Sequence, residues 1–124
     1  MRGDPWVERF LREVLPKLER ELRPSLVVLF GSRIRGDAAE DSDLDVIVVS
    51  EAFAGIPFLK RMPMLLKLTD FGIHLDFLCY TPEEFRRLRG SSLIISQALR
   101  EGLIIRGDGS LEGDADEVDE GPAA

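Results

Sequence analysis

The sequence predicts an α/β (α+β) fold in which a mixed β-sheet of about four strands is covered by helices. Four apolar segments rich in β-branched residues alternate with segments whose apolar residues recur at helical spacing. The order contains no internal repeat, and 124 residues, 44% of them hydrophobic, suit one domain with one core. Such alternation favours a single sheet with helices packed against it.

The chain begins with a predicted amphipathic helix over residues 5–22. Asp4 is a favourable N-cap residue, and Pro5 suits the first helical position. Pro16 lies inside this segment, so we expect it to kink or divide the helix. The apolar residues that recur at helical spacing are Val7, Phe10, Leu11, Val14, Leu18 and Leu22.

The predicted strands are short apolar runs bounded by turn residues. They cover Leu26–Phe30, Leu44–Val49, Ile73–Tyr80 and Leu103–Arg106. The second of these is apolar at successive positions, which indicates burial on both faces. We therefore expect it to lie inside the sheet rather than at an edge.

Three further helices are predicted between and after the strands. The first covers Phe58–Leu68, although Pro57 and Pro63 blur its limits. Thr81-Pro82-Glu83-Glu84 is a capping box and predicts a helix start. The last helix is expected over Ser92–Glu101.

The net charge of −7 is concentrated at the C-terminus. Seven of the 23 acidic residues lie in 107–124, which contains no Lys or Arg, so residues 1–106 carry 16 acidic and 16 basic side chains. We divide the chain into a domain over 1–106 and an acidic tail over 107–124. The tail has too few apolar residues to offset the entropy of ordering, so we expect it to be disordered. A solubilising extension is favoured over a nucleic-acid mimic or a binding tail.

Composition also excludes several classes of protein. Cys79 is the single cysteine, so neither an intrachain disulfide nor a four-thiolate zinc site can form. The apolar runs are too short to span a bilayer, and early acidic residues interrupt any signal-peptide pattern. The balanced domain lacks the basic stripe that phosphate backbones require, so we expect no direct nucleic-acid binding. By elimination we expect a cytoplasmic protein without membrane association.

Two acids open the second strand. Asp43 and Asp45 share one face by strand alternation, while Leu44 and Val46 face the core. Neighbouring carboxylates raise each other's pKa unless a cation lies between them, and they are ligands that hard cations prefer. The alternative is a pair of solvent-facing acids on an edge strand, which the continuous apolar run argues against.

Asp76 strengthens the metal hypothesis. It lies within an apolar strand, where an unpaired charge would be costly, so a cation should compensate it. If this strand lies beside the second one, Asp43, Asp45 and Asp76 converge and can hold two Mg²⁺ ions for in-line displacement at phosphorus. A salt bridge from Asp76 to an arginine is the alternative. His74 shares its face, and we expect it to be structural.

Gly31 and Ser32 follow the first strand and suit a phosphate-binding turn. Glycine permits a tight turn and close backbone approach, and serine offers its hydroxyl and N–H group at a helix start. Arg33 and Arg35 have guanidinium groups that pair well with phosphate. A local ion pair of Arg35 within the loop is an equally good interpretation.

The segment GSRIRGDAAEDSDLDVIVV, with Asp76 on a later strand, resembles the nucleotidyltransferase superfamily typified by DNA polymerase β, kanamycin nucleotidyltransferase and CCA-adding enzymes. Ten residues separate the glycine–serine pair from Asp43, as in that family. The length of the chain is similar to that of the family's smallest branch, the minimal nucleotidyltransferases. The resemblance covers about residues 25–106 and implies the polymerase β-like palm fold. It implies that Gly31 and Ser32 hold the β- and γ-phosphates. It also implies that Asp43 and Asp45 ligate both metals, and that Asp76 ligates the catalytic metal and helps to accept a proton.

The activity implied by the resemblance is Mg²⁺-dependent transfer of a nucleoside monophosphate, AMP from ATP, to a hydroxyl of an acceptor. Because the length leaves no room for an acceptor domain, we expect another molecule to supply that surface. Minimal nucleotidyltransferases resemble antitoxins that transfer AMP to a tyrosine of a HEPN-type toxin, which makes such a toxin the expected partner. A small-molecule nucleotidyltransferase, completed by a dimer, and a non-catalytic nucleotide-binding antitoxin that acts by occlusion remain as alternatives.

Overall fold

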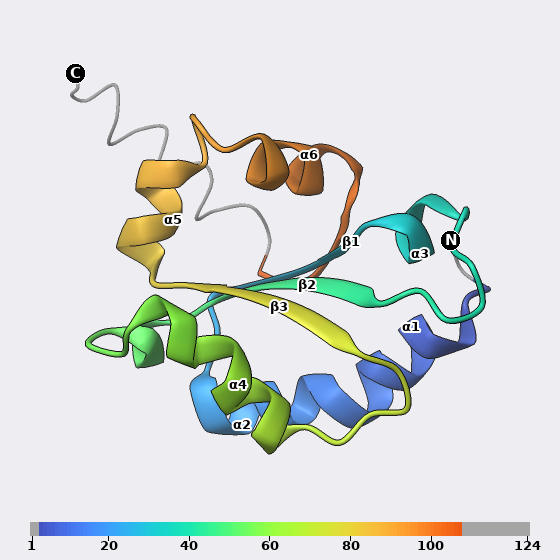
Figure 1. Ribbon diagram of the computed structural model, residues 1–124. Helices are drawn as coiled ribbons and strands as arrows, with labels where there is room; N and C mark the ends of the chain where they lie inside the picture. The colour runs from blue at the N-terminus through green and yellow to red at the C-terminus, as the bar shows by residue number, and fades with distance from the viewer. Residues whose placement is uncertain (1–2, 108–124) are drawn as a thin grey trace.

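A computed structural model describes residues 3–107, which form a mixed four-stranded sheet with helices on both faces (Figure 1). The strand order is β3-β2-β1-β4, with β2 and β3 parallel and β1 antiparallel to both β2 and β4. The predicted fold class is therefore confirmed. The predicted disorder of the acidic tail falls beyond Gly107, outside the described residues. The strands are β1 (Leu26–Phe30), β2 (Leu44–Val49), β3 (Leu75–Tyr80) and β4 (Leu103–Arg106).

Strand β2 lies inside the sheet, as its apolar run predicts. It is hydrogen-bonded to β1 on one side and to β3 on the other. Leu44 and Val46 pack into the core on one face, whereas Ile47 and Val49 pack on the opposite face. Strand β3 begins at Leu75, two residues later than predicted. Within residues 3–107, none of the helices has the length and apolar character needed to cross a bilayer.

The N-terminal helix is divided at Pro16, as expected. It consists of α1 (Pro5–Arg9), a π-helical segment (Phe10–Val14) and α2 (Leu15–Leu22). The Leu15 N–H donates to the carbonyl of Phe10, five residues back. Proline has no N–H and its ring crowds the preceding turn, so the wider π-turn accommodates it without ending the helix.

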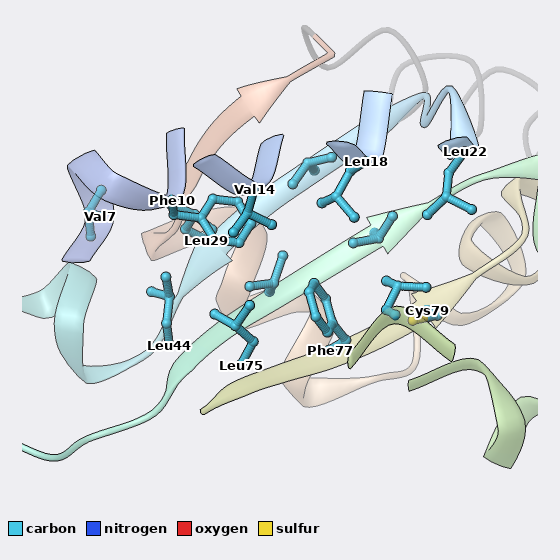
Figure 2. Packing of buried hydrophobic residues seen from close by; sticks show 14 of the residues in the cluster. Val7, Phe10, Val14, Leu18, Leu22, Leu29, Leu44, Leu75, Phe77 and Cys79 are labelled. Atoms are coloured by element: carbon cyan, nitrogen blue, oxygen red, sulfur yellow. The ribbon is translucent and has the colours of Figure 1, made fainter. Parts of the chain in front are cut away.

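One face of the sheet is covered by α1, the π-helical segment, α2 and α4 (Phe58–Leu68), as Figure 1 shows. Figure 2 shows Val7, Phe10, Val14, Leu18 and Leu22 of the N-terminal helix pointing toward side chains of the sheet. These are the residues, apart from exposed Leu11, whose helical spacing predicted the amphipathic face.

The opposite face is covered by α5 (Pro82–Leu88) and α6 (Leu93–Glu101). The predicted capping box starts α5: the Glu84 N–H donates to Thr81 Oγ1 at 3.2 Å, and the Thr81 N–H donates to Glu84 Oε1 at 2.9 Å. Ser92 caps α6 through the Ile95 N–H. Two short elements complete the fold, α3 (Ser32–Arg35) and a 3₁₀ turn (Glu51–Phe53).

A buried ion pair joins α4 to α5 near the C-terminal end of β3. Arg61 is 4% exposed and donates to Glu84 Oε1 at 2.6 Å and to Glu84 Oε2 at 3.1 Å. Its guanidinium also donates to the carbonyls of Ile56 and Cys79. The hydrogen bonds from Arg61 lower the pKa of Glu84 to about 2.

Candidate active site

Asp45 and Asp76 lie side by side on adjacent strands. The parallel register of β2 and β3 pairs residue 45 with residue 76, and both side chains are half-buried. Asp43 is exposed, just before the start of β2, two positions from Asp45. The structure thus brings the three predicted acids to one end of the sheet, on the side covered by α5 and α6.

The three carboxylates interact electrostatically. Partial burial, and then the negative charges of Asp76 and Asp43, raise the pKa of Asp45 to about 6. Arg35 and His74 act in the opposite direction, so both side chains also lie near this carboxylate. The exposed ring of His74, for which we expected a structural role, therefore approaches the site.

Gly31 packs directly against Asp45. Its backbone has φ +88°, and a Cβ at this position would lie 2.0 Å from Asp45 Oδ2. Glycine is therefore required both for the conformation and for the space. The carbonyl of Gly31 accepts from the N–H groups of Ile34 and Arg35, each at 3.0 Å, which fixes the turn at the start of α3. The predicted phosphate-binding turn and the acids thus meet at one point.

A cavity of about 190 Å³ lies between this turn and helix α6. Its α6 wall was not among the residues predicted from the sequence, because only tertiary packing brings α6 beside the turn. Ile94 is 49% exposed and supplies an apolar part of that wall. The lining residues are Phe30, Gly31, Arg35, Asp45, Ile94, Gln97, Ala98 and Glu101.

The structure corrects the expectation for Arg33. Its guanidinium does not face the turn; it is buried against the loop that leads to Asp43 and forms an ion pair with Asp4. The side chain is therefore committed to the protein rather than available to phosphate. Arg35 forms the predicted local ion pair, with its Nε 3.4 Å from Asp37 Oδ2. Its side chain also lines the cavity beside Asp45, and its contact with phosphate stays a prediction.

The three acids have the chemistry that a hard cation prefers, but their side chains are not arranged as a metal site. Among residues 3–107, no group of three acidic, histidine or cysteine side chains is arranged to hold a metal ion as the side chains lie. Three carboxylates nonetheless offer the oxygen ligands that Mg²⁺ prefers. Metal ligation by these acids stays a prediction that requires side-chain rotation.

The chain is similar to a known domain family and to several solved structures. The family model for the nucleotidyltransferase domain matches residues 11–105. A proposed nucleotidyltransferase from Sulfolobus solfataricus is 20% identical, with 83% of this chain and 87% of that chain covered and a TM-score of 0.52. A chain from a toxin–antitoxin structure with AMP-PNP is also 20% identical, with 90% and 86% covered and a TM-score of 0.56. At this identity the two structures show a shared fold. No curated protein matches the chain.

A further structural likeness covers less of the molecule. The BolA domain of SufE1 from Arabidopsis thaliana is 28% identical, with 61% of this chain and 94% of that domain covered and a TM-score of 0.50. The family model, by contrast, spans most of the chain and includes the glycine–serine turn and all three acids. This chain therefore belongs to the nucleotidyltransferase domain family.

Proposed function

We propose that this protein uses Mg²⁺ to transfer a nucleoside monophosphate, AMP from ATP, to a hydroxyl of an acceptor. One observation carries the proposal: the Gly31 backbone contacts Asp45, which lies opposite Asp76 in the sheet. A turn suited to phosphate and acids suited to a cation are thus adjacent. A metal-bound triphosphate needs both.

The proposed roles are those that the resemblance to the nucleotidyltransferase superfamily implies. Gly31 and Ser32 would hold the β- and γ-phosphates, Asp43 and Asp45 would hold both metals, and Asp76 would hold the catalytic metal. Bound Mg²⁺ supplies polarisation of the phosphoryl oxygens and neutralises negative charge. The Arg35 guanidinium, which lines the same cavity, adds positive charge beside the phosphates.

The transfer forms one bond and breaks one bond. The acceptor oxygen attacks the α-phosphorus in line, and the bond from that phosphorus to the bridging oxygen of the β-phosphate breaks. Pyrophosphate leaves, and the hydroxyl proton passes to the carboxylate of Asp76. The chain's own contribution is positioning and charge placement, because phosphoryl transfer requires little covalent chemistry from the protein.

The proposed acceptor is a tyrosine of a HEPN-type toxin. The fold shared with a chain of the toxin–antitoxin structure supports this choice. The cavity supports it as well, because its α6 wall adjoins exposed apolar side chains that a partner surface could cover. Leu93 is 85% exposed and Ile94 is 49% exposed.

The test is incubation of the purified protein with Mg²⁺, ATP labelled at the α-phosphate and lysate of its host. We expect label on one protein band, with the modified tyrosine identified by mass spectrometry. ATP labelled at the γ-phosphate should leave that band dark. The Asp43→Asn, Asp45→Asn double variant should transfer nothing, whereas Asp70→Asn, at an exposed acid outside the site, should transfer normally. Bound ATP without transfer to any protein would reject a protein acceptor and would favour a small-molecule acceptor or occlusion without chemistry.

A second candidate is neutralisation of a partner by occlusion, without transfer. It is favoured by the exposed apolar side chains of Leu93 and Ile94, which offer a partner surface whether or not chemistry follows. The double variant distinguishes the two candidates if it still folds and still binds the partner. Retained neutralisation by that variant would establish occlusion, and lost neutralisation would require the chemistry of the acids.

A further inference from the structure

A single buried arginine ties together the loop between the glycine–serine turn and the acids. The Arg33 side chain is 6% exposed. Its Nε donates to the carbonyl of Ser42 at 2.9 Å, and its Nη2 donates to the carbonyls of Glu40 at 2.8 Å and Ala39 at 3.4 Å. Its Nη1 donates to Asp4 Oδ2 at 3.1 Å. The planar fork of donors, which lysine lacks, suits this set of acceptors.

Asp4 holds the arginine from the other side and links it to the N-terminal helix. One carboxylate oxygen, Oδ1, accepts from the Trp6 N–H at 2.9 Å and caps α1. The other, Oδ2, accepts from Arg33, and the Asp4 side chain is 14% exposed. The start of α1 and the loop before β2 are therefore anchored to the same guanidinium.

These hydrogen bonds also constrain the backbone beside Asp43. Ser42 directly precedes Asp43, and its carbonyl accepts from Arg33. Ser42 also closes a small turn, because its N–H donates to the Ala39 carbonyl and its Oγ accepts from the Ala39 N–H. The next residue, Leu44, donates to the His74 carbonyl at the start of the sheet. The Asp43 backbone is thus held between an arginine-bound carbonyl and the first sheet hydrogen bond.

We propose that Arg33, held by Asp4, is a positioning residue that sets the backbone of Asp43 so that its carboxylate reaches the site beside Asp45. The inference rests on the proposed function, because it assigns Asp43 to the metal. The Arg33 guanidinium is committed to protein acceptors, so its proposed role is indirect. Groups that orient metal ligands typically change metal affinity about 10- to 100-fold when they are altered.

Arg61 provides a matched control. It is also a buried arginine that donates to main-chain carbonyls and to a carboxylate, but it does so near the opposite end of β3. The experiment compares Arg33→Lys with Arg61→Lys below the unfolding transition of both variants. It measures Mn²⁺ affinity by electron paramagnetic resonance and amide hydrogen exchange across residues 36–43.

We expect Arg33→Lys to weaken Mn²⁺ binding about tenfold and to accelerate exchange of the Ala39 and Ser42 amides about tenfold. Arg61→Lys should change both quantities less than about twofold, although both variants lose stability. Asp4→Asn, which keeps a good N-cap, should shift both readouts in the same direction by a smaller factor. It also supplies the test if Arg33→Lys does not fold.

Equal effects of Arg33→Lys and Arg61→Lys would overturn the inference, because they would reflect general destabilisation. Unchanged Mn²⁺ affinity and unchanged exchange in folded Arg33→Lys would overturn it as well. Failure of the unaltered protein to bind Mn²⁺ would reject the proposed function instead. The exchange rates would then still decide whether Arg33 holds the loop.

Discussion

Gly31 and Asp45 are in such close contact that no side chain fits between them. A Cβ on residue 31 would lie 2.0 Å from Asp45 Oδ2 and 3.0 Å from Asp45 Cγ. The register of β1 and β2 creates this contact by pairing Phe30 with Asp45, so the turn begins directly beside the carboxylate. The backbone that we propose for phosphate and the acid that we propose for metal therefore cannot move independently.

Gly31→Ala should impair ligand binding and stability more than the loss of a positive-φ glycine alone would. The clash must displace Asp45 or the turn, so we expect loss of nucleotide and Mn²⁺ binding together with about 2–3 kcal/mol of stability. Gly55→Ala is the matched control, because Gly55 also has positive φ (+83°) but a Cβ there would meet nothing within 4 Å. That control should lose only about 1 kcal/mol. Chemical denaturation and titration calorimetry measure the two effects; equal losses would argue against the contact.

Asp45→Asn should abolish transfer and yet stabilise the metal-free protein at neutral pH. The pKa of Asp45 rises from its ordinary 3.8 to about 6 in the folded state. An acid with a raised folded pKa destabilises the fold progressively as pH rises from about 3.8 to about 6, and the full penalty persists above that range. Two pKa units correspond to roughly 3 kcal/mol, but solvent screening of a half-buried group reduces the gain to about 1 kcal/mol.

Thermal unfolding in EDTA at several pH values between about 4 and 7.5 tests this expectation. The difference between Asp45→Asn and the unaltered protein should vanish at the acidic end, where Asp45 is protonated, and should grow toward neutrality. Asp70→Asn, at an exposed acid, should follow the unaltered protein. A variant that is less stable at pH 7 than the unaltered protein would show that burial of the Asp45 charge and its repulsion by Asp76 and Asp43 do not destabilise the fold.

Glu84→Gln should destabilise the protein without weakening the site. It leaves the Arg61 guanidinium buried without its counter-charge, which costs about 3 kcal/mol. Because the folded pKa of Glu84 is lowered from 4.5 to about 2, its stabilisation is complete above about pH 4.5 and is lost as pH falls toward 2. Glu83→Gln, at an 83% exposed side chain paired with Arg87, should change stability by less than about 0.5 kcal/mol. The free energy of unfolding of both variants is measured as the pH is lowered. Equal acid sensitivity of the two variants would contradict this prediction.

Ile94→Glu should weaken nucleotide binding with little change in stability. Ile94 lines the cavity beside Asp45, so a carboxylate there adds like charge where the triphosphate is proposed to bind. We expect ATP affinity to fall about fivefold, since a like charge near a bound anion costs on the order of 1 kcal/mol. Leu93→Glu, one residue away and 85% exposed, should have a smaller effect. Fluorescent-nucleotide titration measures both, and equal effects would place the nucleotide elsewhere.

The features that the sequence predicted are those encoded by short-range pattern. The limits of β1, β2 and β4, the Thr81 capping box and the division at Pro16 all depend on neighbouring residues. Asp45 and Asp76 were predicted to converge because alternation fixes their faces once the two strands are adjacent. Arg33 shows where this reasoning stops: its spacing suits phosphate, but its partners are loop carbonyls and Asp4, which only tertiary folding brings together. The α6 wall of the cavity could not be predicted from the sequence for the same reason.

Strand β3, which carries Asp76, is the outermost strand on its side of the sheet. Edge elements open with less free energy than the whole domain requires, because fewer hydrogen bonds and contacts break. Separation of β3 from β2 would part Asp76 from Asp45 while the remaining strands stay paired. Heat inactivation should therefore begin below the temperature of global melting. A growing chain likewise cannot become active before β3 has been synthesised and docked.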